Sequence, residues 1–270
     1  MNAIPKGQLP AEMAKVPPMP ATLPSRNILG ISVSVATTQQ ALAYLDDRLQ
    51  RGAPTRVAFF NANTSNVAAA QPRLAAVLQD FIVFCDGIGA DIASWALYGS
   101  AFPENLNGTD FVPRFLCGTR HTLRIFVLGG HPDVLQRAVQ EFQRQAPQHE
   151  YVGSHHGYFQ PDEVPTIVDR IRNLQADLIL VALGTPLQEF WLADHFAATQ
   201  CRLGFSVGGL LDFVSGEKPR APLWMRRMRM EWIYRLMLEP KRMWRRYVVG
   251  NVQFLARVGL AALKNRSRRS

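Results

Sequence analysis

Residues 81–98 read FIVFCDGIGADIASWALY, and the fold can be worked out from this stretch outward. The apolar run Phe81–Cys85 predicts a strand buried within a sheet. The short glycine-rich segment Asp86–Gly89 predicts a loop, and Ala90–Tyr98 then predicts a helix. A strand, a loop and a helix in this order are typical of one unit of a parallel βα fold.

The same alternation of apolar runs and amphipathic stretches continues on both sides of this unit. We expect strands at residues 28–36, 56–60, 81–85, 123–128, 151–153, 177–183 and 203–207. We expect helices at residues 38–49, 64–79, 90–98, 109–117, 132–145, 163–174 and 187–196. The pattern predicts an α/β fold with a Rossmann-like, mostly parallel sheet flanked by helices.

The composition of the 270 residues is that of a packed globular protein, with 47% hydrophobic and 19% charged residues. The three cysteines form no C-x-x-C pair, which is typical of reduced thiols in a cytoplasmic protein. The proline-rich first 26 residues lack the apolar core of a signal peptide. No run approaches the roughly 18 apolar residues of a membrane span, so we expect any membrane contact to be peripheral.

Charge is distributed unevenly along the chain. The net charge is +9, and residues 217–270 hold 15 Lys and Arg but only 3 acidic residues. The sequence therefore predicts a flexible leader at residues 1–26, an α/β core at 27–216 and a basic helical appendage at 217–270. Such polarity indicates an anionic partner, such as phospholipid, nucleic acid or polyphosphate.

The appendage predicts two helices, Leu223–Leu238 and Arg242–Leu263, separated by Glu239-Pro240. The second resembles a basic amphipathic helix and fits an anionic membrane surface at the inner face of the cell membrane. There, each cation contributes about 1 kcal/mol and aromatic rings suit the headgroup zone. The alternative is that both helices pack on the core and merely solvate their charges. Nucleic acid is not expected as a partner, because no motif such as RNP1 occurs.

Polar or glycine-rich loops follow most of the expected strands. They are Asn61-Ala62-Asn63, Asp86–Gly89, Gly129-Gly130, Gly184–Glu189 and Gly208-Gly209. Parallel strands bring these loops to one edge of the sheet, where ligands bind in open α/β folds. We therefore expect a binding site at the carboxyl edge.

Asp86 is the sharpest catalytic candidate, because it ends an otherwise apolar strand. Desolvation at such a position raises a carboxylate pKa toward the value that a general base needs. The alternative is an Asp that caps the following helix. On position alone the two interpretations are about equal.

The other loops fit several kinds of chemistry. Gly87-Ile88-Gly89 suggests a dinucleotide fingerprint, but Ile92 stands where the third glycine is needed. Gly129-Gly130 fits either a phosphate cradle or a tight βα turn. Gln188 and Glu189 fit hydrogen bonding to a sugar or uracil, or helix capping. No D-x-D pair occurs, so we expect no metal and no cofactor.

The order of the motifs resembles the WecG/TagA/CpsF glycosyltransferases (glycosyltransferase family 26) over roughly residues 28–255. The matching segments are Asn61–Asn63, Asp86–Gly89, Glu104–Asp110, Leu128–Gly130, His156–Phe159, Gly184–Glu189, Gly208-Gly209, Arg220–Pro222, Glu231-Trp232, Tyr234–Leu236, Glu239-Pro240 and Arg242. The resemblance implies an inverting, metal-independent hexosyltransferase of bacterial cell-surface or exopolysaccharide biosynthesis. Its donor would be a UDP-sugar and its acceptor a polyprenyl-diphosphate-linked sugar. N-acetylmannosamine, glucose and other hexoses are all compatible.

The resemblance also implies roles for individual residues. Asp86 would be the catalytic base, and arginines of the appendage would contact the diphosphate while the appendage docks on the cytoplasmic leaflet. The expected substrate-binding residues are Asn61, Asn63, Gly87, Gly89, Asn107, Asp110, Gly129, Gly130, Gly184, Gln188, Glu189, Gly209, Arg220, Arg235 and Arg242. Some relatives carry Thr at the position of Asn61. The alternative functions are a non-catalytic nucleotide-sugar-binding protein and a nucleic-acid-binding protein that uses the basic appendage. A homo-oligomer is compatible with the sequence.

Overall fold

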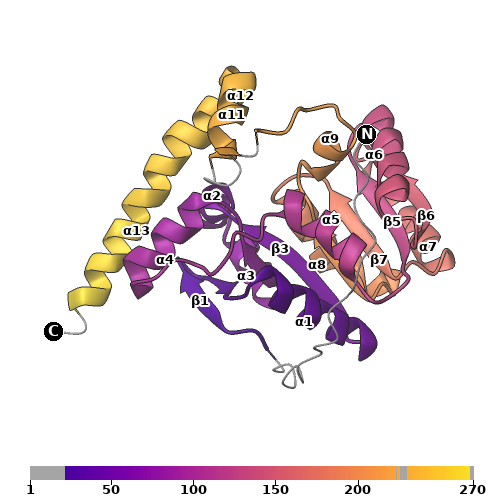
Figure 1. The fold of residues 1–270 in the computed structure, drawn as a ribbon, viewed down its shortest axis with the longest axis horizontal. Helices are drawn as coiled ribbons and strands as arrows, with labels where there is room; N and C mark the ends of the chain where they lie inside the picture. Colours follow the sequence, from indigo (N-terminus) through magenta and orange to yellow (C-terminus); the bar gives the residue numbers. More distant parts are fainter. Residues whose placement is uncertain (1–21, 223, 226–229, 268–270) are drawn as a thin grey trace, which may run out of the picture.

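The computed structural model describes residues 22–222, 224–225 and 230–267, without the side chains of Arg242 and Arg266. Its centre is a six-stranded sheet in the order β4-β3-β8-β7-β5-β6, with every neighbouring pair parallel (Figure 1). The strands are β3 (Thr55–Phe60), β4 (Ile82–Cys85), β5 (Arg124–Gly129), β6 (Glu150–His155), β7 (Leu178–Ala182) and β8 (Leu203–Ser206). The predicted α/β fold with a mostly parallel sheet is confirmed.

Helices cover both faces of this sheet, so that its strands are buried on both sides. One face carries α2 (Ala62–Ala70), α3 (Pro72–Val77), α4 (Ile88–Tyr98), α7 (Val164–Asn173) and α8 (Leu187–Thr199). The other carries α1 (Thr38–Gln50), α5 (Gly108–Gly118), α6 (Pro132–Gln145) and α9 (Leu210–Val214). Successive strand residues point to opposite faces: Ala58 and Phe60 join one apolar core, and Val57 and Phe59 the other. This explains the apolar runs in the sequence.

Two expected elements are divided in the structure. The predicted strand 28–36 is instead an antiparallel hairpin of β1 (Ser25–Ile28) and β2 (Ile31–Ser34), with positive φ angles at Leu29 and Gly30 in its turn. The predicted helix 64–79 is divided into α2, α3 and the 3₁₀ turn η1 (Leu78–Asp80), because Pro72 starts a new helix. Residues 1–21 of the predicted leader lie outside the described residues, and β1 begins within the predicted leader.

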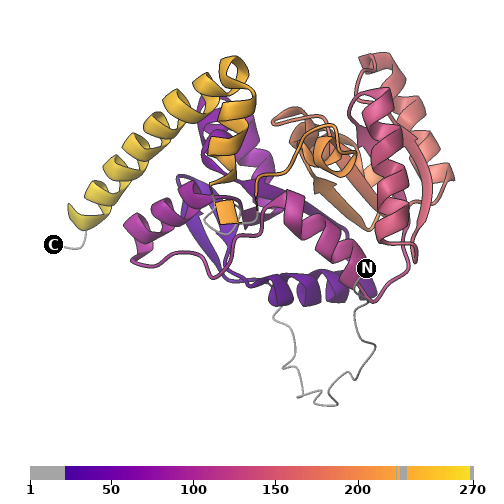
Figure 2. The same cartoon turned by 45° about the horizontal axis from the view of Figure 1, so that its top comes forward.

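The appendage holds α11 (Glu231–Leu238), α12 (Pro240–Trp244), the π-helical turn η3 (Arg245–Val249) and α13 (Gly250–Ser267). The expected second helix thus begins at Pro240 and contains a π-helical segment. Figures 1 and 2 both show α13 lying along α4. Among the described residues, no helix combines the length and apolar character needed to cross a membrane.

Contacts with α2 fasten α13 to the core. The Phe254 side chain is buried, with its ring 6.2 Å from that of Phe60. Asn66 Nδ2 donates to the Gly250 carbonyl at 2.7 Å, and Arg257 Nη1 donates to Asn66 Oδ1 at 3.0 Å. The appendage therefore packs on the core along one face of α13.

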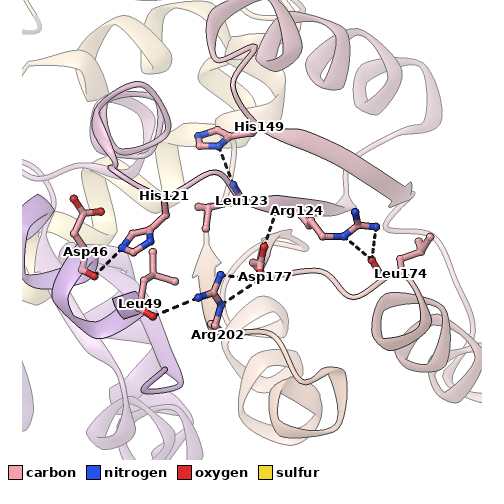
Figure 3. Close-up of polar contacts among 9 residues, drawn as sticks. All are labelled: Asp46, Leu49, His121, Leu123, Arg124, His149, Leu174, Asp177 and Arg202. Atoms are coloured by element: carbon pink, nitrogen blue, oxygen red, sulfur yellow. Dashed lines mark hydrogen bonds and ion pairs between the residues drawn. The ribbon is translucent and has the colours of Figure 1, made fainter. Parts of the chain in front are cut away.

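At the amino edge of the sheet, charged side chains bind the ends of the strands (Figure 3). Asp177 Oδ1 accepts from Arg202 Nε and Nη2 at 3.1 and 2.8 Å, and its Oδ2 accepts from the Arg124 backbone N–H at 2.9 Å. The Arg124 guanidinium donates to the Leu174 carbonyl, and Arg202 Nη1 donates to that of Leu49. These bonds tie β5, β7 and β8 to the neighbouring helices.

His149 completes this edge as a neutral side chain. Its Nδ1 accepts from the Leu123 N–H at 3.2 Å, as Figure 3 shows, and its Nε2 lies 2.7 Å from the Leu116 carbonyl oxygen. One nitrogen accepts and the other donates, which is the pattern of an uncharged imidazole. Burial lowers the pKa of His149, and the hydrogen bond to Leu116 opposes this effect.

Candidate active site

A cavity of about 500 Å³ opens at the carboxyl edge of the sheet. The loops that follow β3, β4, β7 and β8 form its floor, and α11, η3 and the start of α13 form its other side. Ten of the expected site residues line it: Asn61, Asn63, Asp86, Gly87, Gly89, Asn107, Asp110, Gln188, Gly209 and Arg235. The cavity therefore joins the core and the appendage.

Asp86 lies directly after β4 and is held by Asn61. Asn61 Oδ1 caps α2 by accepting from the Thr64 N–H at 3.0 Å, which leaves its Nδ2 to donate to Asp86 Oδ2 at 3.0 Å. The N-cap of α4 is Gly87, and no side chain in the described part of the chain caps that helix. Asp86 thus does not make the capping bond that was its alternative role.

Burial raises the pKa of Asp86 above its ordinary value of 3.8. The hydrogen bond from Asn61 and the charges of Arg235 and Arg246 oppose this rise, and the charge of Asp110 adds to it. A carboxylate whose pKa is raised toward neutrality binds a proton more readily, as a general base must.

Among the described residues of the appendage, two arginines line the cavity with Asp86: Arg235 from α11 and Arg246 from η3. The Arg235 guanidinium lies over the Phe213 ring, 4.4 Å from its centroid. The Nε atoms of both arginines are buried and have no hydrogen-bond partner among the described residues. Buried donors of this kind are costly unless a ligand satisfies them, and phosphate oxygens suit a guanidinium.

Arg220 also has a buried Nε without a hydrogen-bond partner among the described residues, but it differs from Arg235 and Arg246 in forming ion pairs. Its Nη2 pairs with Asp110 Oδ1 at 2.9 Å, its Nε lies 3.3 Å from Glu231 Oε1, and it is not among the cavity-lining residues. Asn107 caps α5 at the same place by accepting from the Asp110 N–H at 2.9 Å. Arg220 therefore links the start of α5 to the appendage, and its expected contact with a diphosphate stays a prediction.

Gln188 and Glu189 have distinct surroundings although they are adjacent. Gln188 lines the cavity, accepts from the Gly208 N–H at 2.9 Å and donates to Glu189 Oε1 at 2.8 Å. Glu189 is fully buried, and this burial raises its pKa. Its side chain orients the Gln188 amide and does not line the cavity.

The expected glycines also separate into two groups. Gly87, with φ of +86°, Gly89 and Gly209 line the cavity, whereas Gly129, Gly130 and Gly184 do not. A Cβ at Gly129 would lie 2.3 Å from the Ala182 carbonyl oxygen. The close approach of β5 to β7 therefore explains why a glycine is needed at position 129, and no bound phosphate is needed to explain it.

Sequence reasoning missed some of the residues at this site. The sequence does not distinguish Arg246 from the other arginines of the appendage, because the π-helical turn changes the side of the helix on which it lies. Asn105, whose Oδ1 accepts from the Gly87 N–H at 2.7 Å, had no signal beyond its motif. The side chain of Arg242 lies outside the described part of the structure.

Among the described residues, no cluster of three or more His, Cys, Asp or Glu is placed to hold a metal.

Comparison with known proteins adds two findings. The model of the glycosyl transferase WecG/TagA/CpsF family matches residues 26–269. Relatives from Staphylococcus aureus strains NCTC 8325 / PS 47, COL and MSSA476 are named N-acetylglucosaminyldiphosphoundecaprenol N-acetyl-beta-D-mannosaminyltransferase. Each is 28% identical over 224 residues, which cover 81% of this chain and 87% of the relative.

Proposed function

The chain belongs to the WecG/TagA/CpsF family of glycosyltransferases, and we propose that it transfers a sugar from a UDP-sugar to a polyprenyl-diphosphate-linked sugar. The observation that carries this proposal is the shared cavity of Asp86, Arg235 and Arg246. An inverting transfer from a nucleotide sugar needs a base for the acceptor hydroxyl and stabilisation of the charge on the leaving diphosphate, and these residues supply both.

The proposed reaction is a single displacement. The Asp86 carboxylate removes the proton of the acceptor hydroxyl, while Asn61 holds one carboxylate oxygen in place. The acceptor oxygen attacks the anomeric carbon from the side opposite the diphosphate, and the bond to the leaving oxygen breaks. Its electron pair stays on UDP, and the configuration at the anomeric carbon inverts.

Arg235 and Arg246 would stabilise the charge that develops on the leaving diphosphate. Their buried Nε atoms lack partners among the described residues, so phosphate oxygens would satisfy donors that the fold leaves unpaired. A guanidinium also binds phosphate in a bidentate manner. We therefore propose that these cations perform the role of a metal ion and that transfer is metal-independent.

The donor and the location are part of the same proposal. The names of the relatives make UDP-N-acetylmannosamine the first donor to test and N-acetylglucosamine diphosphoundecaprenol the first acceptor. The basic appendage would place the cavity at the anionic inner face of the membrane, where a lipid-linked acceptor resides.

The experiment is a screen of labelled UDP-sugars against a polyprenyl-diphosphate-linked N-acetylglucosamine, with the full chain, in the presence and absence of EDTA. We expect transfer from one donor at a rate that EDTA does not change. Binding of UDP-sugars without transfer from any of them would support the non-catalytic alternative. Transfer that depends on an added divalent cation would contradict the role of the arginines.

A further inference from the structure

An exposed apolar surface continues from the mouth of the cavity along α4 and α13. On α4, Ile88, Ile92 and Trp95 follow a spacing of four and three residues, which puts them on one face of the helix, and all three are exposed. On α13, Val252 and Leu255 are three residues apart and Leu263 comes eleven residues, or about three helical turns, after Val252, so these three exposed residues share one side of the helix. We call these six residues the apolar strip.

The two halves of the apolar strip belong to neighbouring helices, because α13 lies along α4 in Figures 1 and 2. Its members are more than incidental surface residues: Trp95 is 67% exposed and Val252 is 66% exposed. Large apolar side chains that gather on one exposed surface mark a binding site more often than single ones do.

The apolar strip is continuous with the candidate active site. Ile88, Ile92, Val252 and Leu255 line the cavity as well as being exposed, and Ile88 is only two residues from Asp86. A ligand on the strip would therefore enter the cavity beside the proposed base. A chain covalently attached to the reacting sugar meets this condition.

The positions of Lys and Arg near the strip indicate which part of a lipid would bind there. Helix α4 contains no Lys or Arg, and those of α13 are Arg257, Lys264 and Arg266, of which only Arg257 precedes Leu263. Arg257 donates to Ser65 and Asn66 on α2, on the side of α13 that packs on the core. Lys264 and Arg266 lie at the far end of the strip, whereas, among the described residues, the part beside the cavity has no cation on its own face and suits a hydrocarbon chain and not an anionic headgroup.

We propose that the apolar strip binds the isoprenoid chain of the acceptor and guides its diphosphate into the cavity. This inference rests on the proposed function, and it assigns to α4 of the core a lipid contact that is separate from the basic appendage. Transfer should then depend on the length of the isoprenoid chain, because each unit that is bound on the strip removes apolar surface from water.

The test compares two acceptors with the same sugar diphosphate, one with two isoprene units and one with an undecaprenyl chain, in non-ionic detergent micelles. For the wild type, we expect kcat/KM to be at least about tenfold higher with the long chain. For the double variant Ile92→Gln with Val252→Gln, we expect the ratio of the two values to approach one. Met237→Gln is the matched control, since Met237 is 73% exposed on α11 but lies outside the strip and the cavity, and it should keep the wild-type ratio.

A double variant that keeps the wild-type ratio would overturn the inference. If the double variant keeps this ratio but no longer binds vesicles, the strip contacts the bilayer. If it keeps the ratio but its self-association changes, the strip contacts a second copy of the chain. Equal transfer to both acceptors by the wild type would also overturn it while leaving the proposed function intact. Absence of transfer to either acceptor would count against the proposed function itself.

A second measurement does not depend on variants. A diazirine-bearing isoprenoid diphosphate is cross-linked to the wild-type chain, and the labelled peptides are mapped. We expect labels on α4 and the first half of α13. Labels confined to α11 and α12 would contradict the assignment of the strip.

Discussion

At the amino edge of the sheet, Asp177 accepts hydrogen bonds from Arg202 and from the Arg124 backbone. At the carboxyl edge, Arg235 and Arg246 have buried Nε atoms with no partner among the described residues, and burial raises the pKa of Asp86. The first set of charges bonds to the strands and helices around it and stabilises the fold. The second set stays available for a ligand, so substitutions at the two edges should have opposite effects on stability and turnover.

The largest effect is expected from Asp86→Asn. The amide keeps the size of the side chain and can still accept from Asn61, but it cannot take a proton from the acceptor hydroxyl. We expect turnover to fall by about a thousandfold while the affinity for UDP-sugar is retained. Turnover is measured with a labelled donor, and binding is measured by calorimetry.

Turnover by Asp86→Asn within a few-fold of the wild type would remove Asp86 as the base. Glu189→Gln is a useful companion, because Glu189 also has a raised pKa but does not line the cavity. We expect its activity to fall less than that of Asp86→Asn.

The next effect concerns the two cavity arginines whose Nε atoms lack a hydrogen-bond partner among the described residues. Arg235→Gln and Arg246→Gln should each lower turnover by about a hundredfold, because each removes a donor from the developing negative charge. Lysine at either position should restore only part of the activity, since it lacks the planar, bidentate donors. Arg245→Gln is the control, because Arg245 is exposed on the same π-helical turn and does not line the cavity. Equal turnover by the Arg245 and Arg246 variants would contradict the assignment.

At the opposite edge, Arg202→Gln should affect stability instead. It removes two hydrogen bonds to Asp177 from a partly exposed pair, so we expect the free energy of unfolding to fall by about 1–2 kcal/mol. Urea unfolding measures this change. Turnover at low temperature should stay within about twofold of the wild type, and a much larger loss would show that the amino edge also contributes to the reaction.

The smallest effect is the pH dependence contributed by His149. Its pKa is lowered in the folded chain, so below about pH 6.5 the unfolded chain binds a proton that the folded chain does not. The stability of the wild type should therefore fall as the pH falls below that value, and His149→Gln should reduce this dependence. Urea midpoints between pH 8 and pH 5 test it, and an identical slope in both proteins would exclude His149 as a contributor.

Sequence patterns could predict the strands and the loops at the carboxyl edge, because strand burial and glycine-rich turns leave local signals. The turn at Leu29-Gly30 was missed because apolar residues continue across it. Pro72 indicates a helix start in the sequence, but the helical pattern on both sides of it led to the prediction of one continuous helix. Element type was therefore easier to predict than the exact ends of elements.

The sequence predicted a site residue only where its place in the chain indicates its chemical role. Asp86 stands out because it ends an apolar strand, whereas its bond to Asn61 depends on the pairing of β3 with β4. Arg220 and Arg246 could not be distinguished by sequence, since ion pairs with Asp110 and Glu231 engage the first and a π-helical turn directs the second. These partners are distant in the sequence and come together only in the fold.

The free energy of unfolding of Asp86→Asn at neutral pH tests the central claim most directly, measured on the preparation used for turnover. The pKa of Asp86 is higher in the folded chain than in the unfolded chain. The stability of the wild type therefore decreases as the pH rises from the pKa in the unfolded chain through the pKa in the folded chain. The amide does not ionise and avoids this loss. We predict a variant whose turnover is lower by about a thousandfold and which is at least as stable as the wild type. A variant that is clearly less stable would contradict the account and show that Asp86 serves the fold.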